Sequence, residues 1–316
     1  MTDLFTRAWR KLNKTVSSFL FLDQWVILVG RNVDYESPSW QDFRPLLPAS
    51  DRYWADPFVL ARSENYYVFI EEKIYQTGRG RIACLTLDKD GNLLSNQTVL
   101  ERPYHLSYPF IFEYNGKMYM LPETAQNRTL ELYRCTRFPD QWEFAKTLMS
   151  DIYMVDATLL ERNGKWWLFA NIKTEGGTSH DKLYLFSANH PLAEVWEPHP
   201  RNPIIADIHG ARPAGRIFEV DGELIRPSQD CSRRYGYALN FNRITMLDGL
   251  NYDEVRHSVF QPPDGGKVLA IHTWNADGGM TVSDAVIRRR KQARTPTSPD
   301  VGLSTSGDVD SRAINA

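Results

Sequence analysis

Polar side chains recur at two matched positions along the sequence, and their types suit acid–base chemistry and ligand binding. The first position opens an apolar segment and holds Asp56, Tyr108, Asp156 and Arg212, with Ser258 beside His257 in a fainter fifth copy. The second position closes the returning segment and holds Glu71, Glu123, Asn171, Gln229 and His272–Thr273. A rigid scaffold that gathers these positions around one point would form a polar site.

Four carboxyl groups in this set are candidates for catalysis. Asp56 is predicted to be a base or nucleophile, and Asp156 to orient the substrate or tune its partner. Glu123 or Glu71 is the candidate acid, because glycosyl transfer needs a carboxylic acid that protonates the leaving oxygen. A structural interpretation stays open, since Asp before Pro commonly starts a strand and a carboxylate there can cap backbone amides.

Other residues near these positions are predicted to bind substrate: Tyr108, Arg212, Arg226, Gln229, His272 and Trp274. The two arginines are suited to bind a phosphate or carboxylate through paired hydrogen bonds. The aromatic rings can stack on sugar faces, although such rings more often belong to the core. His272 is either a base or a packed structural histidine, and packing is favoured. The cysteines and histidines lack metal-ligand spacing, so neither a metal nor another cofactor is expected.

A repeated β-hairpin is predicted to position these side chains. Four segments share a strand, turn and strand pattern: DPFVLARSENYYVFIE (56–71), YPFIFEYNGKMYMLPE (108–123), DATLLERNGKWWLFAN (156–171) and RPAGRIFEVDGELIRPSQ (212–229). The expected turns are Glu64–Asn65, Asn115–Gly116, Asn163–Gly164 and Asp221–Gly222, with a fainter fifth at Gly265–Gly266. Asn-Gly and Asp-Gly are strong signals for two-residue hairpin turns.

The spacing of the hairpins predicts the architecture. They begin 48 to 56 residues apart, as expected for the four-stranded blades of a β-propeller. Five copies predict an all-β, five-bladed propeller over residues 24–291, with the inner strands around a central channel. The last blade lacks a strand, and QWVILVG (24–30) is predicted to pair there and close the ring. A parallel α/β fold is the weaker alternative, because residues 24–290 show no convincing helical pattern.

The two ends of the sequence differ from this region. Residues 4–20, within an N-terminal segment of 1–23, place apolar residues at helical spacing with Arg and Lys between them, which predicts a basic amphipathic helix. This helix either packs on the domain, which is favoured, or contacts an anionic membrane surface. Residues 292–316 contain few large apolar residues and are predicted to be disordered.

Composition limits the expected setting and partners. A net charge of −2 gives no general attraction to nucleic acid, which is therefore not an expected partner. The three cysteines are far apart, which favours a reducing compartment. No segment has the order of a signal peptide or the length of a membrane span. A cytoplasmic protein is expected, with peripheral contact to the inner membrane through residues 4–20 as an option.

A set of motifs resembles a known family. The motifs are WADPF, SYPFIFEYNGKMYMLPE, WWLFA, HPRNPI, RPAGRIF, RPSQDCSRRYGYAL and HTWN. Together they are similar to the N-terminal domain of plant glucosamine inositolphosphorylceramide transferases and its bacterial stand-alone relatives, over roughly residues 24–290. More distantly, the ring looks like the five-bladed arabinanase, levansucrase and invertase superfamily, which includes glycoside hydrolase family 43. These resemblances imply a carbohydrate ligand.

The family 43 resemblance implies roles for two aspartates and fails at one position. Asp56 matches the base of that family and Asp156 its acid-tuning aspartate, whereas Arg212 stands where the proton-donating glutamate is expected. An arginine cannot donate a proton at neutral pH. Hydrolysis would therefore need one of the candidate acids, or Glu72, in that role. The arginine instead suits an anionic group such as a sugar-nucleotide diphosphate.

We therefore expect a propeller that binds or processes an activated or phosphorylated sugar in polysaccharide or glycolipid biosynthesis, in association with a glycosyltransferase. The expected partners are a sugar nucleotide, a sugar phosphate or a glycan. Two alternatives stay open: a non-catalytic glycan-binding or scaffold module, and a glycoside hydrolase with a displaced acid. The plant relatives carry a separate transferase domain without a counterpart here, so their sphingolipid glycosylation is not carried over.

Overall fold

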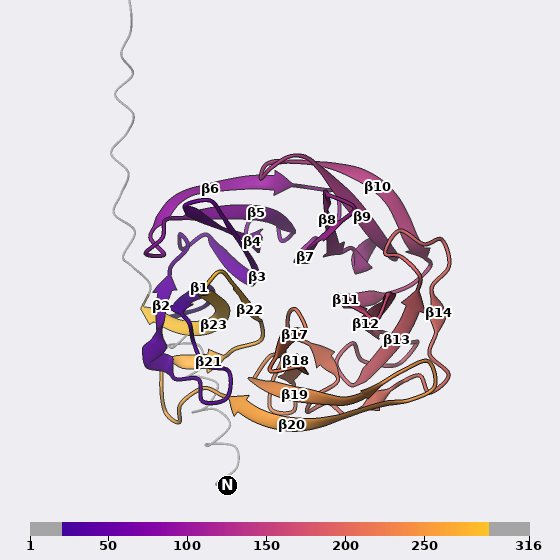
Figure 1. Cartoon of the computed structure of the whole chain (residues 1–316). Coiled ribbons are helices and arrows are strands. Elements are labelled where there is room, and N and C mark those ends of the chain that lie inside the picture. The colour runs from indigo at the N-terminus through magenta and orange to yellow at the C-terminus, as the bar shows by residue number, and fades with distance from the viewer. Residues whose placement is uncertain (1–20, 291–316) are drawn as a thin grey trace, which may run out of the picture.

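The computed structural model describes residues 21–290, which form five antiparallel sheets arranged as blades around a central axis (Figure 1). The predicted all-β, five-bladed propeller is confirmed. The amphipathic helix predicted for residues 4–20 and the tail predicted for 292–316 lie outside the described residues. Strand β1 begins at Phe21, so the propeller starts three residues before the predicted boundary.

The first three blades follow one another along the chain. Blade I consists of β3 (Arg52–Arg62), β4 (Asn65–Ile74), β5 (Gly80–Leu87) and β6 (Leu93–Leu100). Blade II consists of β7 (Ser107–Tyr114), β8 (Lys117–Glu123), β9 (Thr129–Arg137) and β10 (Gln141–Ser150). Blade III consists of β11 (Met154–Arg162), β12 (Lys165–Ile172), β13 (Lys182–Ala188) and β14 (Glu197–Pro198), with β15 (Ile205–Ala206) also paired to β13.

The last two blades are less regular. Blade IV consists of β16 (Arg212–Pro213), β17 (Phe218–Val220), β18 (Glu223–Asp230), β19 (Ala238–Leu247) and β20 (Tyr252–Phe260). Blade V consists of β21 (Val268–Ala270), β22 (Trp274–Asp277), β23 (Met280–Arg290), β1 (Phe21–Arg31) and β2 (Phe43–Leu46). Two short 3₁₀ turns are η1 (Trp40–Asp42) and η2 (Ala125–Asn127). Residues 21–290 include no helix long and apolar enough to cross a membrane.

The hairpin turns of blades II, III and IV lie where the sequence predicts them. Asn115–Gly116, Asn163–Gly164 and Asp221–Gly222 are the turn residues, and all six have positive φ. Two-residue turns with positive φ at both positions match the right-handed twist of paired strands. In blade I, Arg62 pairs with Asn65, so the turn is Ser63–Glu64, one residue before the predicted position.

The hairpin predicted at Gly265–Gly266 is wrong. Those glycines lie between β20 and β21, and Ser258 belongs to β20, an outer strand of blade IV. The inner hairpin of blade V is β22–β23, which turns at Gly278–Gly279. His272–Thr273 therefore open this hairpin, and Asp284 on β23 takes the position that closes it. The error arose because both Gly-Gly pairs follow a polar residue and precede an apolar run.

Blade V closes the ring by joining both ends of the described chain. Strand β1 pairs with β23 from Phe21 opposite Arg290 to Arg31 opposite Met280, as predicted, and β2 extends the same sheet. In Figure 1 the earliest and latest strands lie side by side in this blade. The N-terminal strand covers the outer edge of β23 and makes the ring depend on both ends of the described chain.

The core lies between blades. Each of the five hydrophobic clusters in the described residues combines side chains from neighbouring blades, and the cluster between blades II and III also includes Phe58 of blade I. The alternating side chains of β1 serve two of these clusters: Ile27 packs against blade I, and Val26 and Leu28 pack against blade IV. The interfaces between blades therefore fix how the inner strands face one another.

We predict that Ile27→Ala weakens closure of the ring. Ile27 has no exposed surface, and truncation of a buried isoleucine to alanine usually lowers the free energy of unfolding by about 2–5 kcal/mol. Urea unfolding followed by tryptophan fluorescence measures the change. Val255→Ala removes a side chain that is 55% exposed on β20 and should cost about 0.5 kcal/mol or less. Equal losses in the two variants would contradict a closure role for β1.

Candidate functional site

Three of the residues that open the inner hairpins share an unusual backbone conformation. Asp56, Tyr108 and Asp156 have φ values of 52°, 43° and 53°, in the left-handed region that residues other than glycine rarely adopt. The strand register shifts at each of them, for example between Ala55 and Phe58 in blade I. Such a bulge redirects a side chain, and backbone strain of this kind concentrates at functional sites.

Asp284 joins blades V and I. Its buried carboxylate accepts hydrogen bonds from the backbone N–H groups of Asp56 (2.8 Å), His272 (3.1 Å) and Thr273 (3.0 Å). The carboxylate of Asp56 in turn accepts from the Tyr108 backbone N–H (3.2 Å) and the Thr273 hydroxyl (3.1 Å). Three blades are thus connected near the axis by carboxylates that accept from backbone amides of their neighbours.

His272 is a cation held between two carboxylates. Its Nδ1 lies 2.8 Å from Asp284 and its Nε2 lies 3.6 Å from Asp56, while its ring stacks on Trp25 with centroids 4.0 Å apart. Burial alone would lower the pKa of His272, but the two carboxylates raise it to about 9. Burial raises the pKa of Asp56 to about 6, with the His272 charge opposing the rise. At neutral pH this arrangement holds His272 protonated and most Asp56 ionised.

The same three side chains lie close enough together to be considered as metal ligands. Asp56, His272 and Asp284 each offer a donor atom within 4.8 Å of the other two. A metal requires a neutral imidazole and free carboxylate lone pairs. Here the imidazole is protonated, and Asp284 already accepts from three backbone amides and His272. This donor set therefore fits a hydrogen-bonded ion cluster better than a metal centre.

Asp156 and Arg212 form the second charged pair. Arg212 Nε and Nη2 donate to the two oxygens of Asp156 at 2.6 and 3.2 Å, and Gln229 Nε2 donates to the same carboxylate at 3.1 Å. Arg212 Nη1 donates to the Ser179 carbonyl at 3.1 Å and lies 2.9 Å from His180 Nδ1. Most guanidinium donors are therefore engaged inside the protein. The first role of Arg212 is to neutralise Asp156.

Tyr108 connects the inner strands of three blades through hydrogen bonds of its hydroxyl group. Its hydroxyl lies 2.7 Å from the Thr158 hydroxyl on blade III and accepts a hydrogen bond of 2.8 Å from the Gly215 N–H on blade IV. The side chain has no exposed surface. Tyr108 thus connects blade II to two other blades, and the structure gives it no surface for stacking on a sugar.

Glu71 is a buried carboxyl with polar neighbours. It accepts a hydrogen bond from the Tyr53 hydroxyl at 2.8 Å and lies 3.2 Å from His105 Nε2. The Gly80 N–H donates to His105 Nδ1, so a neutral His105 carries its proton on Nε2 and donates to Glu71. Burial and the negative charge of Asp56 raise the pKa of Glu71 to about 8. Glu71 is therefore mostly protonated at neutral pH.

Glu123 differs from the other axial carboxyl groups in its hydrogen bonding. It ends β8 on the inner hairpin of blade II, opposite Ser107, and is half-buried. Among residues 21–290, no side chain or amide donates a hydrogen bond to its carboxyl group. Burial and the charge of Asp156 raise the pKa of Glu123 well above its usual value, although Arg212 opposes them. Glu123 therefore keeps its proton to a higher pH than a free glutamate does.

Trp274 and Arg226 lie away from this axial cluster, contrary to the sequence-based prediction. Trp274 follows Thr273 directly and points into the core between blades IV and V. Arg226 lies three residues before Gln229 and forms a bidentate pair with Glu254. Because successive strand residues point to opposite faces, an odd separation from an axial residue directs both side chains away.

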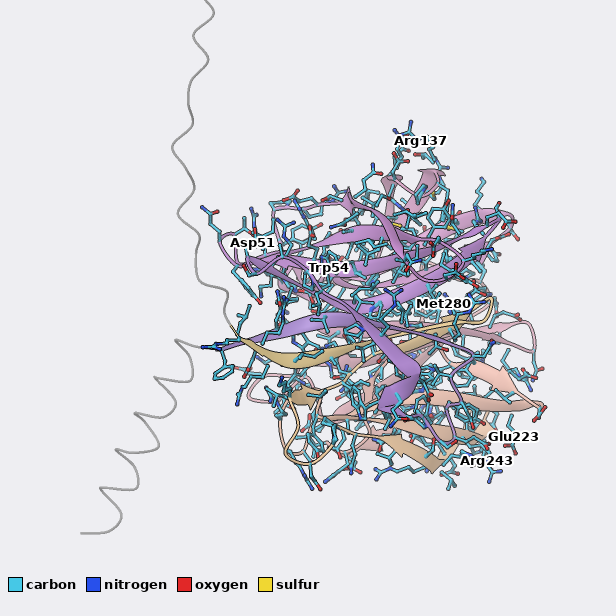
Figure 2. The ribbon with its side chains drawn as sticks, turned by 90° about the vertical axis from the view of Figure 1, so that its left-hand side faces the viewer. Asp51, Trp54, Arg137, Glu223, Arg243 and Met280 are labelled. Atoms are coloured by element: carbon cyan, nitrogen blue, oxygen red, sulfur yellow. The ribbon has the colours of Figure 1, made fainter. Side chains whose placement is uncertain are left out.

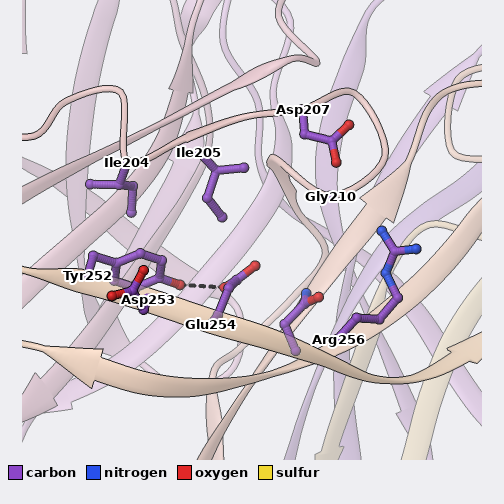
Figure 3. Close-up of a pocket in the computed structure, with 9 residues that line it drawn as sticks. Ile204, Ile205, Asp207, Gly210, Tyr252, Asp253, Glu254 and Arg256 are labelled. Atoms are coloured by element: carbon purple, nitrogen blue, oxygen red, sulfur yellow. Dashed lines mark hydrogen bonds between the residues drawn. The ribbon is translucent and has the colours of Figure 1, made fainter.

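Glu254 belongs to a separate pocket on the side of the propeller. Figure 3 shows this pocket of about 390 Å³, with Ile204, Asp207 and Tyr252 among its walls. Glu72 also lies outside the axial cluster, because Arg81 binds it at 2.6 Å. The structure therefore leaves Glu123 and Glu71 as the axial carboxyl groups that carry protons.

Sequence reasoning missed Asp284, Trp25 and His105. Asp284 had only a weak signal, because it lies five residues after the Gly278–Gly279 turn, whereas Gln229 lies seven residues after Asp221–Gly222. Trp25 had no local signal, since it reaches His272 only when β1 closes the ring. The loop residue His105 likewise meets Glu71 only through the packing of blade II against blade I.

The comparisons with known proteins agree with the fold and point to one family. The family model described as "Glucosamine inositolphosphorylceramide transferase 1, N-terminal" matches residues 47–277. Curated proteins called "Glucosamine inositolphosphorylceramide transferase 1" are 35% identical over 240 residues in Oryza sativa subsp. japonica and 33% identical over 232 residues in Arabidopsis thaliana. These matches cover 72% and 70% of this chain but 32% and 30% of the relatives. The matched region is thus about a third of their length.

Solved structures share the propeller fold. Zg3597, a family 117 glycoside hydrolase from Zobellia galactanivorans, gives a TM-score of 0.53 at 13% identity, covering 84% of this chain and 91% of its own. The catalytic domain of the Coprinopsis cinerea GH62 alpha-L-arabinofuranosidase gives 0.55 at 11% identity, covering 83% and 97%. At these identities the likeness concerns the fold alone, and it agrees with the five-bladed propeller.

We predict that the free energy of unfolding decreases as pH rises from about 5 to about 8, and that Glu71→Gln makes this decrease smaller. Glu71 has a pKa of about 8 when folded and an ordinary value of 4.5, so the folded state holds an extra proton between them. Raising the pH through this interval therefore favours unfolding. Asp56 and His272, whose pKa values are also raised, contribute in the same direction and remain in the variant.

Urea unfolding at several pH values across this interval measures the slope. Glu143→Gln is the matched control, because Glu143 is 66% exposed on β10 and should keep the wild-type slope. If Glu71→Gln also keeps the wild-type slope, Glu71 is not the buried neutral carboxyl described above.

Proposed function

This chain belongs to the glucosamine inositolphosphorylceramide transferase 1 N-terminal family, and on that premise we propose that it is a carbohydrate-active propeller. It binds or processes an activated or phosphorylated sugar in glycolipid or polysaccharide assembly, in association with a glycosyltransferase. The name of the relatives contains a sugar and a phosphorylated lipid, which supports this class of ligand. The activity of the longer relatives as whole proteins enters only as part of this proposal.

One observation carries the proposal: carboxyl groups of different protonation state face one axis. Asp56 has a pKa of about 6 beside the His272 cation and is mostly ionised at neutral pH, so it can accept a proton. Glu123 has a raised pKa and a partly exposed carboxyl, so it can donate one. Glycosyl transfer needs such a division between a base or nucleophile and an acid.

The axial cluster is better suited to a sugar ring than to a phosphate. Arg212 is already paired with Asp156, and His272 with Asp284, so both cations are neutralised. Carboxyl groups accept and donate hydrogen bonds to sugar hydroxyls. Tyr235 is 41% exposed beside His272, with ring centroids 5.3 Å apart, and offers a face for stacking. We assign Arg212 to the tuning of Asp156 rather than to capture of a phosphate.

A second candidate function is a non-catalytic glycan-binding module. It is favoured by the fact that both oxygens of Asp56 and both oxygens of Asp156 accept hydrogen bonds inside the protein. Carboxylates fixed in this way can hold a ligand without taking part in proton transfer. The two candidates differ in one measurable property, which is turnover of the bound sugar.

We predict that Asp56→Asn weakens sugar binding and that Glu123→Gln preserves binding but lowers turnover by about 10² or more, the usual contribution of a general acid. Binding is measured by thermal shift against nucleotide sugars, sugar phosphates and neutral oligosaccharides, because a ligand of the native state raises the melting temperature. Turnover is measured as release of nucleoside diphosphate or free sugar. Glu143→Gln, an exposed carboxyl-to-amide change on blade II, should leave both unchanged.

The outcomes separate the candidates. Binding by the wild type with no turnover of any bound sugar supports the glycan-binding module. Release of free sugar that depends on Glu123 supports hydrolysis with a displaced acid, whereas release of nucleoside diphosphate without an equal amount of free sugar, the sugar being bonded to an added acceptor, supports transfer. Failure of the wild type to bind any sugar overturns the proposal.

A further inference from the structure

A second pocket lies at the opposite end of the axis, between blades IV and V. It has a volume of about 220 Å³, and its walls include Val33, Tyr35, Arg216, Phe218, Val220 and Trp274. Val220 directly precedes the Asp221–Gly222 turn of blade IV, so the pocket lies at the end where the hairpins turn. The carboxyl cluster lies at the other end, where the hairpins begin.

The side view separates these two ends. Figure 2 shows residues near the start of β3 toward one face and residues near the hairpin turns of blades IV and V toward the other: Asp51 and Trp54, then Met280, Glu223 and Arg243. Tyr108 lies between the ends, because its backbone N–H reaches Asp56 and its hydroxyl reaches Gly215, the residue before Arg216.

Arg216 is the charged group of this pocket. Its Nη2 donates to the Ile111 carbonyl at 2.9 Å, and its guanidinium lies 5.4 Å from the centroid of the Phe110 ring. Both contacts are with uncharged groups. Burial lowers the pKa of Arg216, with the charge of Asp277 opposing this. The guanidinium is therefore a positive charge in surroundings that compensate it poorly.

The two buried arginines of blade IV show how such a charge is normally compensated. Arg212 is bound bidentately by Asp156, and Arg226 by Glu254. Arg216 forms no ion pair with a carboxylate anywhere in residues 21–290. A partly buried charge without a partner is unfavourable, and an anion from outside the described residues would remove that cost.

The backbone holds Arg216 firmly in place. Its N–H donates to Asn275 Oδ1 at 2.9 Å. Gly215, just before it, has a φ of 128°, and a Cβ there would lie 2.1 Å from the Trp274 carbonyl oxygen. Only glycine fits at this point. The guanidinium is thus presented from a segment between β16 and β17 that these contacts hold in place.

The walls of the pocket complement the charge with apolar surface. The Tyr35 and Phe218 rings pack edge to face with centroids 5.2 Å apart, and Trp274 belongs to the core cluster behind them. A hydrated inorganic ion would leave this surface unused. A small anionic group that carries a short apolar chain or ring would use both features.

We propose that this pocket is a second ligand site, which binds an organic anion whose carboxylate or phosphate pairs with Arg216 while its apolar part packs on Tyr35, Phe218 and Trp274. A carboxylate ligand and a phosphate ligand of this kind have the same two features, which are one charged group and a small apolar part. The site is independent of the sugar-binding proposal, since none of its residues belongs to the carboxyl cluster.

Isothermal titration calorimetry with hexanoate and hexyl phosphate tests the site on the wild-type chain. We predict that at least one binds, that hexanol and inorganic phosphate bind about tenfold or more weakly, and that Arg216→Met weakens binding by a similar factor through loss of a charge-assisted hydrogen bond. The comparison of hexanoate with hexyl phosphate identifies the preferred anion. Asp56→Asn should bind these probes as the wild type does.

One further variant and one further measurement complete the test. Ala276 lines the pocket and is exposed, so Ala276→Leu fills the space without removing the charge and should also weaken binding. Arg216→Met removes a charge that lacks a partner, so its thermal unfolding should match or exceed that of the wild type. No binding of either anion, equal binding of hexanol, or unchanged binding in both variants overturns the proposal.

Discussion

The burial of charge near one axis is the constraint on which the rest of the structure depends. Five carboxyl groups gather there, from Asp56, Glu71, Glu123, Asp156 and Asp284. Removing an unpaired ion from water costs several kcal/mol even after relaxation, on the order of the stability of a whole domain. The protein meets this constraint by placing two cations, Arg212 and His272, among the three aspartates and by raising the pKa values of the two glutamates.

This solution requires rigid inner strands. A shift of one bulge by one residue would turn its side chain to the other face and leave a cation without its partner. The left-handed residues at the hairpin heads are held because amides of one blade donate to carboxylates of the next. The β1–β23 pairing then locks the ring, and Trp25 of β1 also covers His272. The pairing of β1 with β23 therefore both closes the ring and completes the site.

The two ends of the axis differ in chemistry because they differ in what compensates charge. At the end where the hairpins begin, Arg212 and His272 each have a carboxylate partner, and the protonated glutamates supply hydrogen-bond donors suited to hydroxyl groups. At the end where they turn, Arg216 meets only a carbonyl, an aromatic face and apolar walls. Tyr108 and Gly215 join these environments through a single hydrogen bond of 2.8 Å. One scaffold thus presents a polar site and an amphipathic site along the same axis.

The sequence by itself determined the local features of this protein. The Asn-Gly and Asp-Gly turns predicted three hairpins at their observed positions, because positive φ is demanded by the turn itself. The repeat spacing predicted five blades, and Asp56, Asp156, Glu71, Glu123, Arg212 and Gln229 were placed at hairpin ends that do meet near the axis. Once a turn is located, the strand residues can be counted outward from it on both sides. This count identifies the residues that begin and end each hairpin.

Tertiary structure decided the contacts and the charges. Trp274 and Arg226 were misplaced because each lies an odd number of residues from an axial neighbour, and only the strand register shows which face it takes. Asp284 lies on the last hairpin and Trp25 on the closing strand β1. Both are far in sequence from residues that they contact, Asp56 and His272 respectively. Whether a glutamate holds its proton, or an arginine is already paired, depends on burial and on the charges brought beside it. Those are properties of the folded ring, which no local stretch of sequence specifies.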